Sequence, residues 1–330
     1  MEKQVLDVKN LTIQYKTDLE TVYAVNDVSF SLNAGETLGL VGETGAGKTT
    51  TALGIMGLLP ERTARIPEGT VTFEGRNLLT LSDQEMQKVR GSSISMIFQD
   101  PMTALNPVLP VGKQIGEALY LHNEKNLSQK EIEAKVEETL ELVGIPKERK
   151  VEYPYQFSGG MRQRVVIAIA LVCNPALLIA DEPTTALDVT IQAQILHLLL
   201  DLQKQTGMSI ILITHDLGVV AQTCRKVAVM CGGYVVESGT VEEIFLEPAH
   251  PYTKALIASM PKVGGGAFEQ FLERDLSEHS EMLCPFLNRC KYAEASCESS
   301  LPAYREITPG HLVRCHLCRT EIKGKEHSHE

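Results

Sequence analysis

The residues best suited to chemistry form one glycine-rich stretch that fits the pattern G-x-x-x-x-G-K-[ST]: Gly42, Glu43, Thr44, Gly45, Ala46, Gly47, Lys48 and Thr49. Glycines let successive backbone N–H groups turn toward one anion, and a helix that begins near Lys48 adds the positive end of its dipole. Lys48 is expected to reach the β- and γ-phosphates of a nucleotide, and the Thr49 hydroxyl to bind Mg²⁺. Thr50 follows in the same helix start. The stretch therefore predicts a phosphate site at residues 42–50.

A pair of acidic residues follows the apolar run LLIA at residues 177–180. Such a run predicts a buried strand whose carboxyl end presents Asp181, where the carboxylate can bind the shell of a Mg²⁺ ion. Glu182 comes next, and its carboxylate can polarise an attacking water. Acidic residues at a strand end are common by themselves, but together with the phosphate loop they predict hydrolysis of the nucleotide.

A second anion site is predicted where Ser158, Gly159 and Gly160 open a helix. It need not serve the same nucleotide as the first. His215 follows an apolar strand from which a side chain can reach a γ-phosphate, and Gln99 follows another short strand. Taken alone, His215 is more often a structural histidine and Gln99 an ordinary polar residue.

The elements that must position these residues are strands alternating with helices, which predicts a parallel sheet covered on both faces. Residues 1–40 alternate apolar and polar side chains and are predicted to form strands, with turns at Asn26-Asp27 and Ala34-Gly35. Residues 101–165 are predicted to be a mostly helical insert, because Ser128 and Glu131 form a capping box ahead of an apolar helical period.

Composition excludes some functions. The chain has 330 residues with 31 Lys and Arg against 42 Asp and Glu, a formal net charge of −11. Phosphate backbones repel an acidic protein that lacks a basic patch, and no run of Lys and Arg supplies one, so we expect no nucleic-acid partner. The longest apolar run, at residues 165–173, falls well short of the roughly 20 residues that span a bilayer. We expect a chain that does not cross the membrane.

The order and spacing of these motifs resemble ATP-binding cassette (ABC) proteins over roughly residues 5–240. The matching motifs are the Walker A loop at 42–49, the Q-loop at Gln99, the signature at 158–160, the Walker B strand at 177–181, the D-loop at Ala186-Leu187-Asp188 and the switch histidine at His215. The resemblance implies an α/β P-loop NTPase cassette, with a RecA-like parallel sheet core, an antiparallel β subdomain and a helical insert. Phe157 and Met161 depart from the commonest signature but leave its serine and glycines in place.

The same resemblance implies the mechanism. Two cassettes stack head to tail, and each ATP lies between the Walker A loop of one chain and the signature of the other. Glu182 would be the catalytic base, assisted by His215 and Gln99, and Tyr15 would stack on adenine, with Tyr23 as a nearby competitor. The implied Mg²⁺ ligands are Thr49, Gln99 and Asp181.

Three further segments, at residues 250–253, 284–290 and 310–316, resemble the C-terminal extension of dipeptide and oligopeptide (nickel/peptide) importers. We therefore predict an ATPase domain at 1–245 and a small cysteine-rich module at 246–330. Residues 264–266, three glycines, are predicted to be a linker.

That resemblance implies a motor subunit that hydrolyses ATP to drive import of di- or oligopeptides from the cytoplasmic face of the cell membrane. Its implied partners are a second, related ATPase subunit, two membrane permease subunits and an extracytoplasmic solute-binding protein. The segment around residues 99–110 is expected to contact the permease. Alternatives are an importer of nickel or another small solute, a soluble cassette ATPase outside transport, and a subunit whose ATPase is vestigial.

Five of the eight cysteines lie near the C-terminal end, which predicts a metal site. Gaps of five, six and seventeen residues separate Cys284, Cys290, Cys297 and Cys315, wider than the close pairs usual for zinc. The Cys315-x-x-Cys318 pair keeps Zn²⁺ open, with His311 and His316 as further candidates, and free thiols are the plain alternative. The family resemblance implies a structural [4Fe–4S] cluster on those first four cysteines, with Cys318 as a spare.

Overall fold

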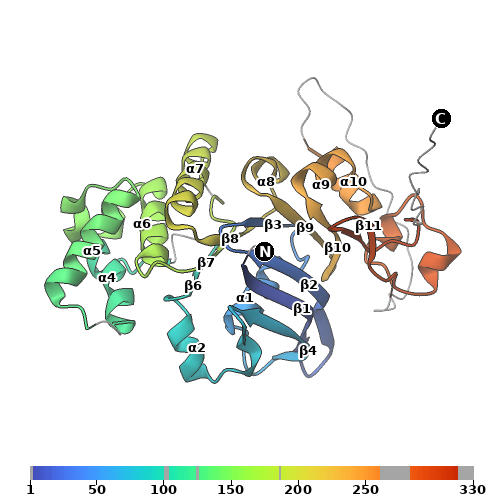
Figure 1. Ribbon diagram of the computed structural model, residues 1–330, viewed down its shortest axis with the longest axis horizontal. Coiled ribbons are helices and arrows are strands. Elements are labelled where there is room, and N and C mark those ends of the chain that lie inside the picture. The colour runs from blue at the N-terminus through green and yellow to red at the C-terminus, as the bar shows by residue number, and fades with distance from the viewer. Residues whose placement is uncertain (1–2, 100–103, 124–125, 186, 261–282, 319–330) are drawn as a thin grey trace, which may run out of the picture.

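The computed structural model describes residues 3–99, 104–123, 126–185, 187–260 and 283–318. Two β-sheets organise this part of the chain (Figure 1). The larger sheet has the strand order β11-β12-β10-β9-β3-β8-β7-β6. In that order its strands are Arg305–Thr308, His311–Val313, Tyr234–Thr240, Lys226–Cys231, Thr37–Val41, Ser209–Thr214, Leu177–Asp181 and Ile94–Ile97.

The parallel core of this sheet runs from β9 to β6. Strands β3, β7 and β8 are buried along their whole length, as expected for strands covered on both faces. The smaller sheet is antiparallel, with the order β2-β1-β4-β5. Its strands are Thr21–Asn33, Gln4–Lys16, Ala64–Phe73 and Arg76–Asn77. The prediction of a parallel core with an antiparallel β subdomain is confirmed.

Helices α4, α5 and α6 form a helical subdomain at one end of the molecule, and α8, α9 and α10 lie toward the other (Figure 1). In chain order the α-helices are α1 Lys48–Met56, α2 Asp83–Val89, α4 Val111–Leu121, α5 Gln129–Leu142, α6 Gly159–Leu171, α7 Val189–Thr206, α8 Leu217–Thr223, α9 Val241–Leu246 and α10 Pro251–Ala258. Short 3-10 turns are η1 Leu78–Thr80, η2 Lys147–Val151, η3 Pro154–Gln156, η4 Leu287–Arg289 and η5 Ala295–Glu298. Within the described ranges, none of the helices has the length and apolar character needed to cross a membrane.

The helical insert is confirmed, and its capping box forms as predicted. Ser128 Oγ accepts a hydrogen bond from the Glu131 N–H at 3.4 Å, and the Glu131 carboxylate accepts one from the Ser128 N–H at 2.8 Å. Among the helices of the insert whose bounds the structure describes, the first is α4, which begins at Val111, and residues 100–103 lie outside the described part.

The predicted turn at Asn26-Asp27 is wrong, because both residues lie inside the long strand β2. Asp27 has φ 49°, a left-handed conformation that short polar side chains tolerate, and its N–H donates to Thr12 Oγ1 at 3.2 Å. Asn26 donates its N–H to Gly233 O at 2.8 Å. The pair is a strand irregularity that ties the two sheets together.

The C-terminal residues are not separate from the ATPase sheet. β12 pairs antiparallel with β10, and β11 continues the same sheet beyond it. Arg314 is 3% exposed and forms an ion pair with Asp27 of the smaller sheet, with 2.5 Å between Nη2 and Oδ2. The guanidinium also lies 4.0 Å from the ring centroid of Tyr304. Residues 305–314 therefore complete the cassette's own packing, and the glycine linker lies outside the described residues.

Candidate nucleotide site

The phosphate loop connects β3 to α1, as predicted from the strand before it and the helix from Lys48. Lys48 is 6% exposed, and its Nζ donates to Gly42 O at 2.7 Å and Glu43 O at 2.9 Å. Burial lowers the pKa of this ammonium. Gly42 has φ +151°, and an added Cβ would lie 2.1 Å from Met230 O, so this position admits only glycine. The Lys48 ammonium thus holds the start of the loop through its two carbonyl contacts.

One pocket of ≈ 250 Å³ collects most of the predicted residues. Its lining is Ala24, Thr44, Gly45, Ala46, Gly47, Lys48, Thr49, Thr50, Gln99, Glu182 and His215. Side chains from β6, β7 and β8 meet the loop here because the carboxyl ends of parallel strands lie at one edge of a sheet. Ala24, from the smaller sheet, was not predicted to line the site, because it belongs to none of the motifs.

Glu182 is the centre of a hydrogen-bond network at the pocket wall. Its carboxylate accepts from Gln99 Nε2 at 3.0 Å and Thr185 Oγ1 at 2.9 Å, and it lies 3.1 Å from His215 Nδ1. Burial acts to raise the pKa of Glu182, but hydrogen bonds from His215 and Thr185 outweigh it and hold that pKa below its usual value. The carboxylate is therefore ionised at neutral pH, the form that a general base needs.

The backbone at Glu182 is also specialised. It has φ 46° and donates its N–H to Ile213 O at 2.9 Å. A left-handed non-glycine residue stores strain, which is a recurrent property of functional positions. Thr185 was not predicted, although its spacing of three residues from Glu182 closes a turn, with Thr185 N–H donating to Glu182 O at 3.1 Å.

Asp181 fits the role of a magnesium ligand. It is 2% exposed at the end of β7, and burial raises its pKa although the Thr49 hydroxyl bonds to it. Its Oδ1 is buried and lacks a hydrogen-bond partner among the described residues. A buried carboxylate oxygen without a partner is costly, and a cation beside Thr49 would satisfy it. The residues present therefore fit a Mg²⁺ ion.

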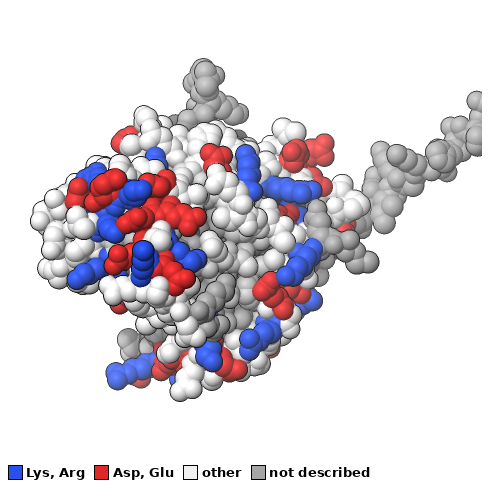
Figure 2. Space-filling view, turned by 60° about the vertical axis from the view of Figure 1, so that its left-hand side comes forward, with Lys and Arg blue, Asp and Glu red and all other residues white. Residues whose placement is uncertain are grey.

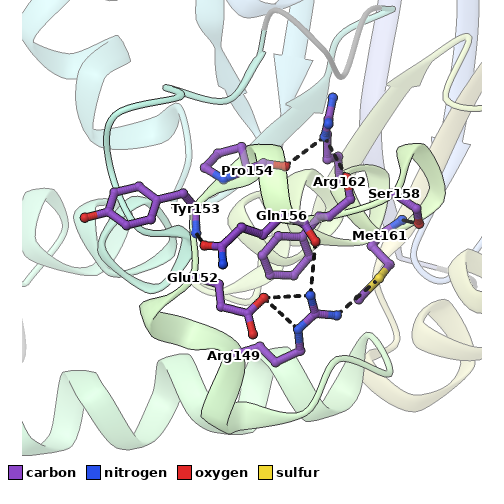
Figure 3. Close-up of polar contacts among 9 residues, drawn as sticks. Arg149, Glu152, Tyr153, Pro154, Gln156, Ser158, Met161 and Arg162 are labelled. Atoms are coloured by element: carbon purple, nitrogen blue, oxygen red, sulfur yellow. Dashed lines mark hydrogen bonds and ion pairs between the residues drawn. The ribbon is translucent and has the colours of Figure 1, made fainter.

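The signature residues lie outside this pocket, on α6 of the helical subdomain. Ser158 caps the helix, its Oγ accepting from Met161 N–H at 3.4 Å (Figure 3). Arg162 Nε anchors the preceding turn through Pro154 O at 2.9 Å, and Arg149 stacks 4.4 Å from the Phe157 ring centroid. The phosphate loop and the start of α6 therefore do not line one pocket, and the role of each as an anion site stays a prediction.

Two predictions on the adenine and D-loop motifs stay predictions. Tyr15 lies on β1 with Val22 as its cross-strand partner, and it is not among the residues that line the pocket. Ala186 lies outside the described residues, and Asp188 caps α7, its Oδ1 accepting from Ile191 N–H at 3.0 Å.

The four predicted cluster cysteines do meet. Cys284, Cys290, Cys297 and Cys315 line one cavity together with His250 and His316. Cys318 does not line it and lies 3.9 Å from Ala249 O. In the described ranges, however, no group of three or more His, Cys, Asp and Glu side chains is arranged to hold a metal ion. The cluster and its zinc alternative are not confirmed, because convergence on a cavity is not ligand geometry.

The remaining zinc candidate, His311, is hydrogen-bonded to another side chain. His311 Nε2 lies 2.7 Å from the fully buried carboxylate of Glu237, which also accepts from the N–H groups of Ala249 and His250 at 2.7 and 2.9 Å. This buried network explains His311 as a structural residue that joins β12 to β10 and to the start of α10.

Comparison with known proteins agrees with this geometry. Residues 25–185 match the family described as ABC transporter, and residues 236–297 match the oligopeptide/dipeptide transporter C-terminal region. The dipeptide transport ATP-binding protein DppD of Bacillus subtilis is 51% identical over 96% of this chain and 95% of its own length. The oligopeptide transport ATP-binding protein OppD of the same organism is 55% identical over 81% and 75% of the two chains.

A solved dimeric ATP-binding cassette, in a post-hydrolysis state bound to ADP and phosphate, is 30% identical. It superposes with a TM-score of 0.63 over 72% of this chain and 98% of its own length. The phosphate loop, the acidic strand end, the separate signature helix and these relatives lead to one conclusion. The chain belongs to the ABC transporter family of ATPases, and it carries that family's oligopeptide/dipeptide transporter C-terminal region.

Proposed function

We propose that this chain is the ATP-hydrolysing motor subunit of an importer for di- or oligopeptides, located on the cytoplasmic face of the membrane. The observation that carries the proposal is the 51% identity to a dipeptide transport ATPase over nearly the full length of both chains. Purification from membranes should recover two permeases and a peptide-binding protein. Cells that lack the chain should lose uptake of a labelled dipeptide, and uptake should return with the intact chain but not with Lys48→Ala. Unchanged uptake would refute the peptide assignment.

Within the site we assign roles by geometry. Lys48 and the loop N–H groups bind the phosphates, and Asp181 with Thr49 and Gln99 would hold Mg²⁺, whose charge stabilises the transferred phosphoryl group. Glu182 orients and deprotonates water, and His215 contacts the γ-phosphate. Gln99 and His215 both contact the Glu182 carboxylate, so Glu182 must exchange one of these contacts for a water before it can act.

A second cassette is required because the signature serine lies outside the pocket of its own chain. We propose that a related subunit places its ATP against Ser158, Gly159 and Gly160 of this chain. The N-terminus of α6 would bind the phosphates of the ATP that the partner brings. A chain purified alone should dimerise only with ATP, and mixing with the related subunit should tighten that association.

The permease would dock at the segment around residues 99–110, whose last residues, Leu109 and Pro110, line a groove of the helical subdomain. This groove of ≈ 640 Å³ runs between α4 and α5, bordered by Gly112, Gly116 and Ile132. Tyr120 and Val151 border the same groove with exposures of 54% and 66%, so the groove offers exposed apolar surface to a partner. Tyr120→Glu should keep ATP binding and reduce recovery of the permeases. Equal recovery would place the contact elsewhere.

No nucleic-acid partner is proposed. On the face that Figure 2 shows, Lys and Arg are interspersed with Asp and Glu over the helical subdomain rather than gathered in a stripe. With a net charge of −11, such a surface offers no track for a phosphate backbone.

We propose that the four convergent cysteines hold a structural [4Fe–4S] cluster, the donor set that thiolates supply. One buried polar atom without a hydrogen-bond partner supports the presence of a bound group in this cavity. His250 is 1% exposed and lines the same cavity, and its Nε2 has no hydrogen-bond partner among the described residues. Because its Nδ1 accepts from Tyr252 N–H at 3.0 Å, the Nε2 of the neutral ring carries the proton and can donate. Anaerobic purification followed by iron, sulfide and zinc analysis tests this, and one zinc without iron or sulfide would overturn it.

A further inference from the structure

The phosphate loop is held from outside by a residue that lies 246 positions away in the sequence. Arg289 makes a bidentate ion pair with Glu43, the second residue of the loop, with Nη1–Oε1 and Nη2–Oε2 both 2.9 Å. The fork of a guanidinium on a carboxylate fixes orientation as well as distance. The Arg289 side chain is 25% exposed and that of Glu43 49%, so the pair lies at the rim of the site.

Aromatic side chains fix the arginine and the loop together. Tyr252 is 1% exposed, and its hydroxyl accepts the Glu43 N–H at 3.0 Å. Its ring meets Phe286 edge-on, with centroids 5.4 Å apart, and the Arg289 guanidinium lies 5.2 Å from the Phe286 centroid. Both the backbone N–H and the side chain of Glu43 are therefore bonded to residues of the C-terminal region, Tyr252 and Arg289.

A second contact holds the opposite side of the loop. Gly233, in the turn between β9 and β10, donates its N–H to Ala46 O at 3.1 Å. Its neighbour Gly232 packs so closely on Pro285 that an added Cβ would lie 2.6 Å from the proline Cβ. The segment that carries Pro285 and Arg289 thus supports the loop at two places, one directly and one through this turn.

We infer that Arg289 is a positioning residue for ATP binding, through which the C-terminal cysteine segment sets the nucleotide affinity of the phosphate loop. The physical reason is twofold. The ion pair fixes the loop in the shape that presents its N–H groups, and it neutralises a carboxylate that would otherwise repel the phosphates. Pro285 and Arg289 each adjoin a cavity cysteine, Cys284 or Cys290, so displacement of that segment would loosen both supports. The inference needs only nucleotide binding and does not depend on peptide import.

The test is a titration of the purified full-length chain with a fluorescent ATP analogue. We expect Arg289→Met to weaken binding about three- to tenfold, the usual result of removing a charged partner from a partly exposed bidentate pair. Arg289→Lys keeps the charge but loses the fork, and we expect an intermediate affinity. Lys254→Met, an exposed cation on the same helix as Tyr252, is the matched control and should bind like the original chain.

A double-mutant cycle tests whether Arg289 acts on ATP binding through Glu43. In a Glu43→Gln background the carboxylate is neutral, so adding Arg289→Met should weaken binding by less than about twofold, since coupled sites are not additive. In the assembled transporter Arg289→Met should raise KM for ATP and leave kcat nearly unchanged, whereas a general folding defect would lower kcat and the melting temperature. Unchanged affinity of Arg289→Met would overturn the inference. So would the same loss of affinity with and without the Glu43 carboxylate.

Discussion

Replacing the carboxylate at position 182 separates binding from hydrolysis in this site. Glu182→Gln keeps the length and shape of the side chain, and its amide oxygen can still accept from Gln99 or Thr185, which now donate at 3.0 and 2.9 Å. What disappears is the basic oxygen. A positioned general base contributes about 10²- to 10⁴-fold to a rate, so we expect hydrolysis to fall by that factor.

Nucleotide affinity should barely change in Glu182→Gln, because Lys48 and the loop do not use the carboxylate as a hydrogen-bond partner. The assay is phosphate release from the assembled transporter beside a titration of the isolated chain with a fluorescent ATP analogue. With ATP present, size-exclusion chromatography should show a dimer that persists, because the nucleotide is not consumed.

Thr185→Val is the graded control for that experiment. It removes one hydrogen bond to Glu182 and leaves the carboxylate, so we expect a loss in kcat of about tenfold, from the roughly 1.5 kcal/mol of a bond to a charged group. Hydrolysis by Glu182→Gln within about tenfold of the original rate would refute the role of Glu182, since even weak general bases contribute more.

Three further outcomes are expected. Gly42→Ala should abolish nucleotide binding in a titration, because its Cβ would meet Met230 O at 2.1 Å. Gly45→Ala should weaken binding less, because its Cβ would meet no atom within 4 Å and only the φ of +82° is strained. Glu237→Leu should destabilise the chain by about 3–5 kcal/mol in urea unfolding, because it removes the buried carboxylate that accepts from His311 and from the N–H of Ala249. Ser158→Arg should block ATP-dependent dimerisation, seen by light scattering, without weakening binding to the same chain's loop.

Each of these has its own check. Glu242→Gln, which changes an exposed acid in the first turn of α9, should unfold like the original chain, and equal destabilisation would remove the network as the cause. Burial acts to raise the pKa of Glu237, but hydrogen bonds from His311 and from the N–H groups of Ala249 and His250 hold this pKa below its usual value, near 4.5. A lowered pKa means that this stabilisation is complete above about pH 4.5 and is lost as the pH falls through the folded value. If Ser158→Arg lost binding as an isolated chain, the two-chain site would be wrong.

Local sequence patterns were sufficient to predict several elements of the cassette. Glycine spacing, apolar runs and capping boxes act through backbone chemistry within a few residues, so they predicted the loop, β7, the start of α1 and the capping of α5. The same patterns misassigned Asn26-Asp27, since a polar pair with a left-handed residue is as compatible with a strand irregularity as with a turn.

The sequence by itself determined the catalytic motifs and their order, because each motif is a short segment with its own chemistry. Only the tertiary structure decided which side chains engage one another. It placed Gln99 and His215 on Glu182, left Asp181 Oδ1 without a partner in the described residues, and joined Arg289 to Glu43. These contacts join positions from 33 to 246 residues apart. They depend on how sheets and helices pack, and no local pattern of residue types encodes that packing.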